Sequence, residues 1–124
     1  MNREMSQVND FNKIWSPPTA PRALTTDDIA KLMPHAPAWS VVSRRGGPRL
    51  QRVFTCRTFS DAMWFVLKVG ELVESEGQRP TILIDWNRVT IVLRSAKSNG
   101  LHRDDFLAAS KIDTIWLDKA RSDA

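Results

Sequence analysis

The fold of this chain is decided by residues 74–105, which read ESEGQRPTILIDWNRVTIVLRSAKSNGLHRDD. Two runs of aliphatic and β-branched residues, 81–84 and 89–93, flank a short segment at 85–88. Runs of this kind around a short turn predict a β-hairpin. Gly100 ends the loop that follows, and two aspartates at 104 and 105 indicate a helix start, because the N-terminus of a helix favours negative charge.

Within this stretch a set of residues falls in the frame Glu74-x3-Gln78-Arg79-Pro80-x5-Trp86-x9-Ala96-x8-Asp105. The frame resembles the signature of the pterin-4a-carbinolamine dehydratase family. In that family an acidic residue is followed by His-His-Pro, an aromatic residue, a third histidine and an aspartate. The acid, the proline, the aromatic residue and the aspartate match here, whereas the three histidine positions hold glutamine, arginine and alanine.

The resemblance implies a pocket for a 4a-hydroxy-tetrahydropterin whose dehydration needs protons to be moved by imidazoles. Imidazole suits this task because its pKa lies near neutral pH, whereas Gln78 does not titrate, Arg79 stays charged and Ala96 has no polar side-chain atom. General acid–base catalysis contributes roughly 10²–10⁴-fold. We therefore expect no catalytic residues and no enzyme activity. The alternative is an active or residually active dehydratase that uses His102 or Glu74.

Arg79 has two further interpretations in this degenerate pocket. It could pair with Glu74, Asp85 or Asp105 and close the pocket, which is the default expectation. It could instead receive a carboxylate from a partner protein.

The resemblance covers about residues 24–117 and implies an α+β fold. This fold is a four-stranded antiparallel sheet with three helices packed on one face, in the order αββαββα. The residue patterns agree, with expected helices near 25–33, 58–75 and 102–117 and an additional hairpin of strands at 39–42 and 50–55. The expected layout is a flexible, Pro-containing tail at 1–22, a pterin dehydratase-like domain at 23–118 and a C-terminal tail at 119–124.

Charge is unevenly distributed in this chain, whose net charge is +4. The segment from Ile29 to Ser60 contains no acidic residue, and four of its arginines are expected on the exposed rim of the first hairpin: Arg44, Arg45, Arg49 and Arg52. Such a rim is either simply solvated or steers an acidic partner. A nucleic acid partner is disfavoured, because the sequence has no recognised nucleic-acid-binding motif and no interleaving of basic with aromatic residues.

Other features bound the remaining classes of function. The second expected helix carries Trp64 and Leu67 outside its core stripe, which indicates a subunit interface and a homodimer. The two histidines, His35 and His102, are isolated, and the one cysteine, Cys56, has no partner cysteine, so no metal site or cofactor is expected. The sequence shows neither a membrane span nor a signal peptide, which predicts a cytoplasmic protein.

The degenerate frame and the chain layout also resemble the α-carboxysome Rubisco assembly factors. This resemblance implies a non-catalytic protein that assists the folding or assembly of Rubisco, with Rubisco subunits as clients, in a bacterial cytoplasm and in association with carboxysomes. The alternatives are the active dehydratase already described and a dimerisation cofactor of a transcription factor.

Overall fold

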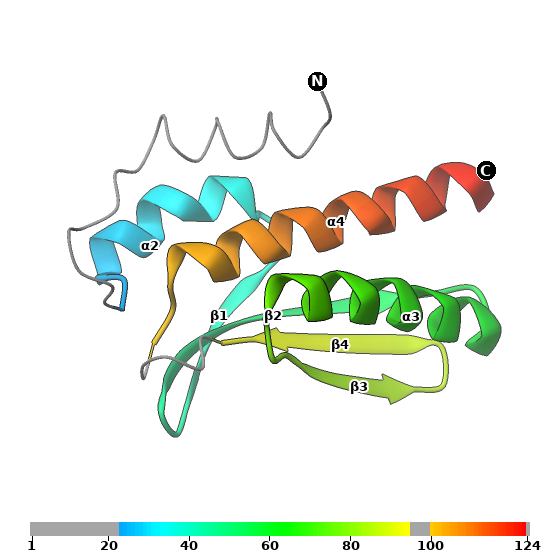
Figure 1. Cartoon of the computed structure of the whole chain (residues 1–124), viewed down its shortest axis with the longest axis horizontal. Helices are drawn as coiled ribbons and strands as arrows, with labels where there is room; N and C mark the ends of the chain where they lie inside the picture. The colour runs from blue at the N-terminus through cyan, green and yellow to red at the C-terminus, as the bar shows by residue number, and fades with distance from the viewer. Residues whose placement is uncertain (1–22, 95–99, 124) are drawn as a thin grey trace.

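The computed structural model describes residues 23–94 and 100–123. Its four strands form one antiparallel sheet in the order β1-β2-β4-β3, and the described helices all lie on one face of it (Figure 1). The strands are β1 (Ser40–Arg44), β2 (Gly47–Thr55), β3 (Thr81–Asp85) and β4 (Arg88–Leu93). The helices are α2 (Thr26–Leu32), the 3-10 turn η1 (Met33–His35), α3 (Phe59–Glu76) and α4 (Arg103–Asp123). The predicted α+β class and the order αββαββα are confirmed. The expected N-terminal tail and Ala96 lie outside the described residues.

Local signals set the starts of the first two helices. In α2 the Thr25 hydroxyl accepts from the backbone N–H of Asp28, while the Asp28 carboxylate accepts from the backbone N–H of Thr25. This reciprocal pair is a capping box, which satisfies amides that have no partner within the helix. Thr58 caps α3 by accepting from the N–H of Asp61, and Gly77 ends that helix in the left-handed region with φ 73°.

The last helix is longer than the sequence predicted. We expected it to end near Leu117, with residues 119–124 as a tail, yet α4 continues to Asp123. The sequence there contains neither glycine nor proline, and Lys119 anchors the extra turn to α3. Its Nζ lies 3.2 Å from Asp61 Oδ1 and 5.1 Å from the centroid of the Trp64 ring. The expectation failed because a tertiary contact, rather than local polarity, decides where this helix ends.

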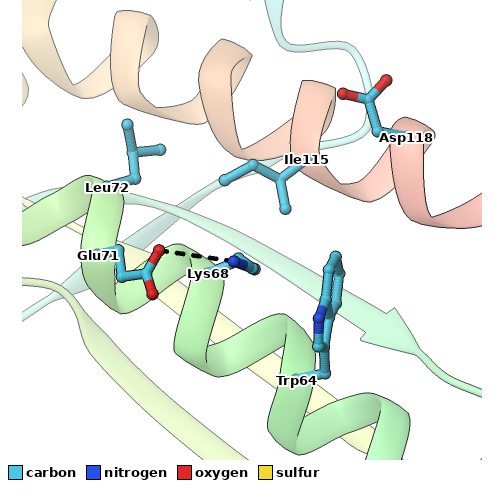
Figure 2. A pocket seen from close by; sticks show the side chains of 6 residues that line it. All are labelled: Trp64, Lys68, Glu71, Leu72, Ile115 and Asp118. Atoms are coloured by element: carbon cyan, nitrogen blue, oxygen red, sulfur yellow. Dashed lines mark ion pairs between the residues drawn. The ribbon is translucent and has the colours of Figure 1, made fainter.

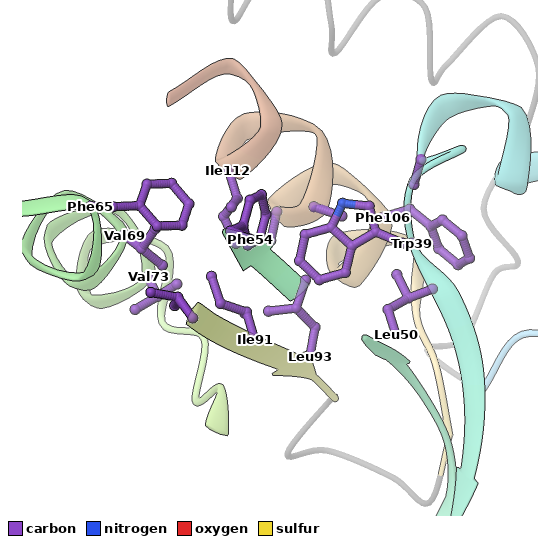
Figure 3. Packing of buried hydrophobic residues seen from close by; sticks show 14 of the residues in the cluster. Trp39, Leu50, Phe54, Phe65, Val69, Val73, Ile91, Leu93, Phe106 and Ile112 are labelled. Carbon is purple, nitrogen blue, oxygen red and sulfur yellow. The ribbon is translucent and has the colours of Figure 1, made fainter. Parts of the chain in front are cut away.

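The core lies between the helices and the facing side of the sheet. Phe54 of β2 is at its centre, with its ring centroid 4.7 Å from that of Phe65 and 5.2 Å from that of Trp116. Figure 3 shows the large side chains that pack together there: Trp39, Leu50, Phe54, Phe65, Val69, Val73, Ile91, Leu93, Phe106 and Ile112. The helices therefore hold the sheet mainly through aromatic and aliphatic contacts around one phenylalanine.

A polar cluster within this layer ties α4 to the first hairpin. Asp113 Oδ1 accepts from Trp39 Nε1 at 2.8 Å and from Arg52 Nη1 at 2.6 Å. The Arg52 guanidinium also lies 4.3 Å from the centroid of the Phe54 ring. Burial raises the pKa of Asp113, while the hydrogen bonds from Trp39 and Arg52 oppose that rise. Arg52 therefore joins the helix-facing side of the sheet to α4.

Candidate functional site

The frame residues 74–80 form the connection from α3 to β3. After Gly77 the backbone N–H of Gln78 returns to the carbonyl of Val73 at 2.9 Å, which closes the helix and sets the direction of the next residues. The Gln78 side chain is half-buried, whereas Glu74 and Arg79 are exposed. The three residues therefore lie in one short connection, as the frame predicts. Only Gln78 is partly buried there, whereas Glu74 and Arg79 are exposed to solvent.

Arg79 does not close a pocket in the way that we expected. Within residues 23–94 and 100–123, it forms no ion pair with Glu74, Asp85 or Asp105. Its side chain is exposed, and the carboxylate of Asp105 is used elsewhere. The default intramolecular pairing of Arg79 is therefore wrong for the described carboxylates.

Asp105 is a fully buried carboxylate in the first turn of α4. Its Oδ2 accepts from the backbone N–H of His102 at 2.9 Å, while its own N–H donates to the carbonyl of His102. Oδ1 has no hydrogen-bond partner among the described residues. Burial raises the pKa of Asp105 to about 6, against the opposing hydrogen bond from His102, and the nearby Asp104 charge adds to the rise. Asp105 is thus a group at this end of the molecule that titrates near neutral pH.

Trp86 does not belong to the same pocket, contrary to our expectation. It lies in the turn between β3 and β4, whereas Arg79 precedes β3, so the length of a strand separates them (Figure 1). At about 3.3 Å per residue, the separation is roughly 20 Å. Trp86 stacks instead on Phe59 at the start of α3, with ring centroids 5.2 Å apart and planes 19° apart. The linear spacing of the frame concealed this separation because β3 is fully extended.

The remaining frame and site residues offer little acid–base chemistry together. Glu74 is exposed on α3, His102 is half-buried before α4, and Ala96 lies outside the described residues. Gln78 has no titratable proton. Across the described ranges no group of three His, Cys, Asp or Glu side chains is placed to hold a metal ion.

The four predicted rim arginines separate into two places. Arg44 and Arg49 belong to the hairpin side away from the helices, and Arg45 lies in its turn. The Arg44 guanidinium donates to Gln51 Oε1 at 3.2 Å, and that of Arg49 donates to the carbonyl of Arg45 at 2.9 Å. Arg52 faces the helices and pairs with Asp113. The basic rim therefore contains the exposed Arg44 and Arg45 and the half-buried Arg49, and alternation along β2 removes Arg52 from it.

Sequence reasoning missed a groove between α3 and α4 (Figure 2). It has a volume of about 430 Å³ and is lined by Trp64, Lys68, Glu71, Leu72, Ile115 and Asp118. The Lys68 ammonium lies 3.8 Å from a Glu71 carboxylate oxygen. The sequence did show more apolar residues on α3 than one core stripe needs. It did not show that α4 forms the second wall of the groove.

Beside this groove α3 carries an exposed apolar stripe of Phe59, Met63 and Leu67, which are 41%, 45% and 60% exposed. Their i, i+4 spacing places them on one side of the helix. A Cβ added at Gly70, near the end of the stripe, would meet no atom within 4 Å. A second polypeptide backbone therefore has room to approach α3 closely at this position.

Comparisons with known proteins agree with this fold. Residues 22–115 match the family model described as pterin 4 alpha carbinolamine dehydratase. A candidate pterin-4-alpha-carbinolamine dehydratase of Gloeobacter violaceus is 43% identical over 79% of this chain and 84% of its own length. One of Nitrosococcus oceani is 40% identical over 79% of this chain and 86% of its own length.

Two solved structures share the fold at lower sequence identity. A transcriptional coactivator/pterin dehydratase from Brucella melitensis is 24% identical, with a TM-score of 0.69 over 76% of this chain and 98% of that one. A pterin dehydratase-like protein identified as a RuBisCO assembly factor in the alpha-carboxysome is 23% identical. Its TM-score is 0.55 over 65% of this chain and 92% of that one.

None of the helices within residues 23–94 and 100–123 has the length and apolar character that a bilayer span requires.

Proposed function

Because this chain belongs to the pterin-4a-carbinolamine dehydratase family, we propose that it is a non-catalytic member that assists the assembly of Rubisco in association with carboxysomes. The observation that carries the proposal is the replacement of the three family histidines by Gln78, Arg79 and Ala96 within an otherwise matching frame. None of these side chains exchanges a proton near neutral pH. The retained fold is then available for binding rather than for turnover.

The likeness to a structure identified as a RuBisCO assembly factor supports the client that we propose. At 23% identity that likeness concerns the fold, which dehydratases share, so the substituted frame remains the deciding observation. The mechanism that we propose is holding. A dimer presents two symmetry-related surfaces to an assembling Rubisco subunit, and Arg44, Arg45 and Arg49 attract its acidic groups.

The second candidate is dehydratase activity, favoured by the names of the curated relatives. Within this reading the candidate acid is Asp105, whose pKa is raised to about 6 by burial. Its carboxylate is completely buried, however, and accepts a backbone hydrogen bond from His102. A substrate would therefore need the start of α4 to open before it could exchange a proton with Asp105.

A turnover assay separates the two candidates. We expect the protein to consume freshly generated 4a-hydroxy-tetrahydropterin at the rate of the enzyme-free blank, because it lacks the imidazoles worth roughly 10²–10⁴-fold. The matched variant carries Gln78→His, Arg79→His and Ala96→His, and we expect its rate to exceed that of the wild type. Wild-type turnover within about a hundredfold of an authentic dehydratase would contradict a non-catalytic role.

Association with Rubisco is tested separately. Rubisco large subunit diluted from denaturant is mixed with the protein, and the yield of assembled Rubisco is followed by native electrophoresis. We expect a higher yield of assembled enzyme than with an equal mass of albumin. Equal yields together with no detectable complex would overturn the assembly role, whatever the result of the turnover assay.

Self-association through the α3 stripe is part of the proposal. Replacing Leu67 with glutamate places a charge where an apolar contact with a second copy would be buried, and such burial of a leucine is worth about 1.5–3 kcal/mol. We expect the dimer of the wild type to become a monomer in light scattering at micromolar concentration. The matched control is Leu117→Glu on α4, where the native side chain is 54% exposed, and it should remain dimeric. A wild-type monomer, or a dimeric Leu67→Glu variant, would refute this interface.

A further inference from the structure

The sheet has a second face that no described helix covers. Figure 1 shows α2, α3 and α4 on the same side of the strands. The strand register assigns alternate residues to the opposite side, because paired residues of antiparallel strands point the same way. We call this side the open face. Its paired residues are Ser40, Val42, Arg44, Gly47, Arg49, Gln51, Val53, Thr55, Thr81, Leu83, Asp85, Arg88, Thr90 and Val92.

An apolar centre lies in the middle of the open face. Val53 of β2 and Leu83 of β3 both pair with Thr90 of β4, so the three residues form one row across the sheet. Val92 lies two residues further along β4 on the same face. Val53 is 41% exposed and Leu83 is 60% exposed. Apolar side chains grouped on an exposed sheet face are typical of a binding surface, whereas single exposed ones are ordinary.

Positive charge borders this apolar centre at the first hairpin, whereas at the other end Arg88 lies directly across from Asp85. Arg44 and Arg49 lie on the first hairpin, and Arg88 lies beside the turn between β3 and β4. The strand rise of about 3.3 Å puts Arg49 and Arg88 roughly 20 Å apart. None of these three arginines forms an ion pair with a carboxylate of the residues that the structure describes. Asp85 is the one carboxylate among the paired residues of the open face.

Helix-side basic residues behave differently. Arg52, Lys111 and Lys119 each pair with an acid, Asp113, Glu76 and Asp61 respectively, which fastens helices to the sheet or to each other. The arginines of the open face lack such partners, so their charge is available to a binding protein. An apolar centre inside a polar, charged border is the usual arrangement of a protein–protein contact surface.

We propose that the open face is a docking surface for an acidic protein, whose aliphatic patch covers Val53 and Leu83 and whose carboxylates meet Arg44 and Arg49. Charge complementarity selects this partner, because the first-hairpin end of the surface carries Arg44 and Arg49 with no carboxylate opposite them. A single-stranded nucleic acid suits it less well, since no aromatic residue is among the paired residues of this face to stack on bases. The inference deepens the proposed function and rests on it for the role of Arg44 and Arg49, and it adds the apolar centre at Val53 and Leu83 and a stated partner chemistry.

Fluorescence anisotropy with a synthetic probe tests the surface directly. The probe is a fluorescein-labelled peptide with a central aliphatic segment and glutamates at both ends, and its match carries lysines in place of the glutamates. We expect the glutamate peptide to bind more tightly, with an affinity that falls as salt is raised. The Leu83→Glu variant and the Arg49→Glu variant should each weaken binding about tenfold or more.

Matched controls place the same changes on the helix side. Leu117→Glu replaces a similarly exposed leucine, and Arg121→Glu reverses an arginine whose side chain is 68% exposed. Both should bind the glutamate peptide within about twofold of the wild type, since surface changes away from a contact have small effects. Circular dichroism confirms that every variant is folded.

Each of three outcomes would overturn the proposal. These are equal affinity for the lysine peptide, equal weakening by the helix-side controls, and tighter binding of a single-stranded oligonucleotide than of the glutamate peptide.

The Rubisco assembly measurement separates this inference from the proposed function. If Leu83→Glu assembles Rubisco as well as the wild type does, the client does not use this face. If the wild type fails in assembly but binds the glutamate peptide at this face, the docking surface stands and the Rubisco role falls.

Discussion

Replacing Phe54 with alanine is expected to lower the free energy of unfolding by about 3–5 kcal/mol, the range for large-to-alanine changes at buried aromatic residues. Phe54 is 1% exposed and contacts the rings of Trp39, Phe65 and Trp116. Trp39 directly precedes β1, Phe65 belongs to α3 and Trp116 belongs to α4. The substitution therefore leaves a cavity where the sheet and both long helices meet, and no single element can collapse to fill it.

Urea denaturation followed by circular dichroism measures this loss. The matched control is Val53→Ala, one residue away on the open face, where the side chain is 41% exposed; it should cost less than about 1 kcal/mol. If Phe54→Ala fails to fold, the milder Phe54→Leu variant should still be less stable than Val53→Ala. Equal losses at positions 53 and 54 would mean that the register of β2 is not the one described.

Replacing Asp105 with asparagine is expected to stabilise the protein at neutral pH. Burial raises the pKa of Asp105 to about 6, whereas an aspartate in an unfolded chain titrates near about 3.9. The amide oxygen of asparagine can still accept the hydrogen bond from the backbone N–H of His102. Asparagine therefore keeps the shape and the main contact of the native side chain but removes the cost of burying a charge.

The sign of the pH dependence follows from the raised pKa. Below about pH 4 both the folded and the unfolded state hold the Asp105 proton, so the group makes no electrostatic difference. As pH rises from about 4 to 6, the unfolded state loses the proton first, and the free energy of unfolding falls. By about pH 7 both states have lost the proton and the penalty is nearly complete, at on the order of 3 kcal/mol.

Denaturation of the wild type and of Asp105→Asn across this pH range provides the check. The stability advantage of the variant should grow from near zero at pH 4 to its full value near pH 7. Asp104→Asn is the matched control, since Asp104 is exposed in the same helical turn, and its effect on stability should be much smaller. An advantage of Asp105→Asn that is constant with pH would show that proton binding by this carboxylate is not its source.

Periodicity and local caps predicted the elements of the fold because they depend on near neighbours. Thr58 with Asp61, and the alternation of β4 between Val89, Ile91 and the residues that separate them, can be recognised without tertiary information. The end of α4 could not be predicted in this way. It depends on Lys119 reaching Asp61 of another helix, and burial contributes to that contact only once the chain is folded.

The residues of the candidate site could be identified from the sequence, but their positions relative to one another could not. The frame put Trp86 beside Arg79, but an extended strand carries the two to opposite ends of the sheet. Arg52 resembled its neighbouring arginines in sequence, yet strand alternation turned it towards Asp113. Asp105 was recognisable as a helix-start acid, whereas its complete burial follows from packing between distant segments.

The alternation along β2 and β4 has a consequence for how such a protein can diverge. Phe54 and Ile91 determine whether the domain folds, while their immediate neighbours Val53 and Thr90 face outward and contribute little to that requirement. Packing in the core thus limits which residue types can occupy the helix-facing positions of each strand. Substitutions at the alternate, open-face positions affect stability less, so these positions can change to form a binding surface. An ancestral scaffold built in this way can lose a chemical activity at the end of its sheet and acquire a partner on its flat side, without passing through an unstable intermediate sequence.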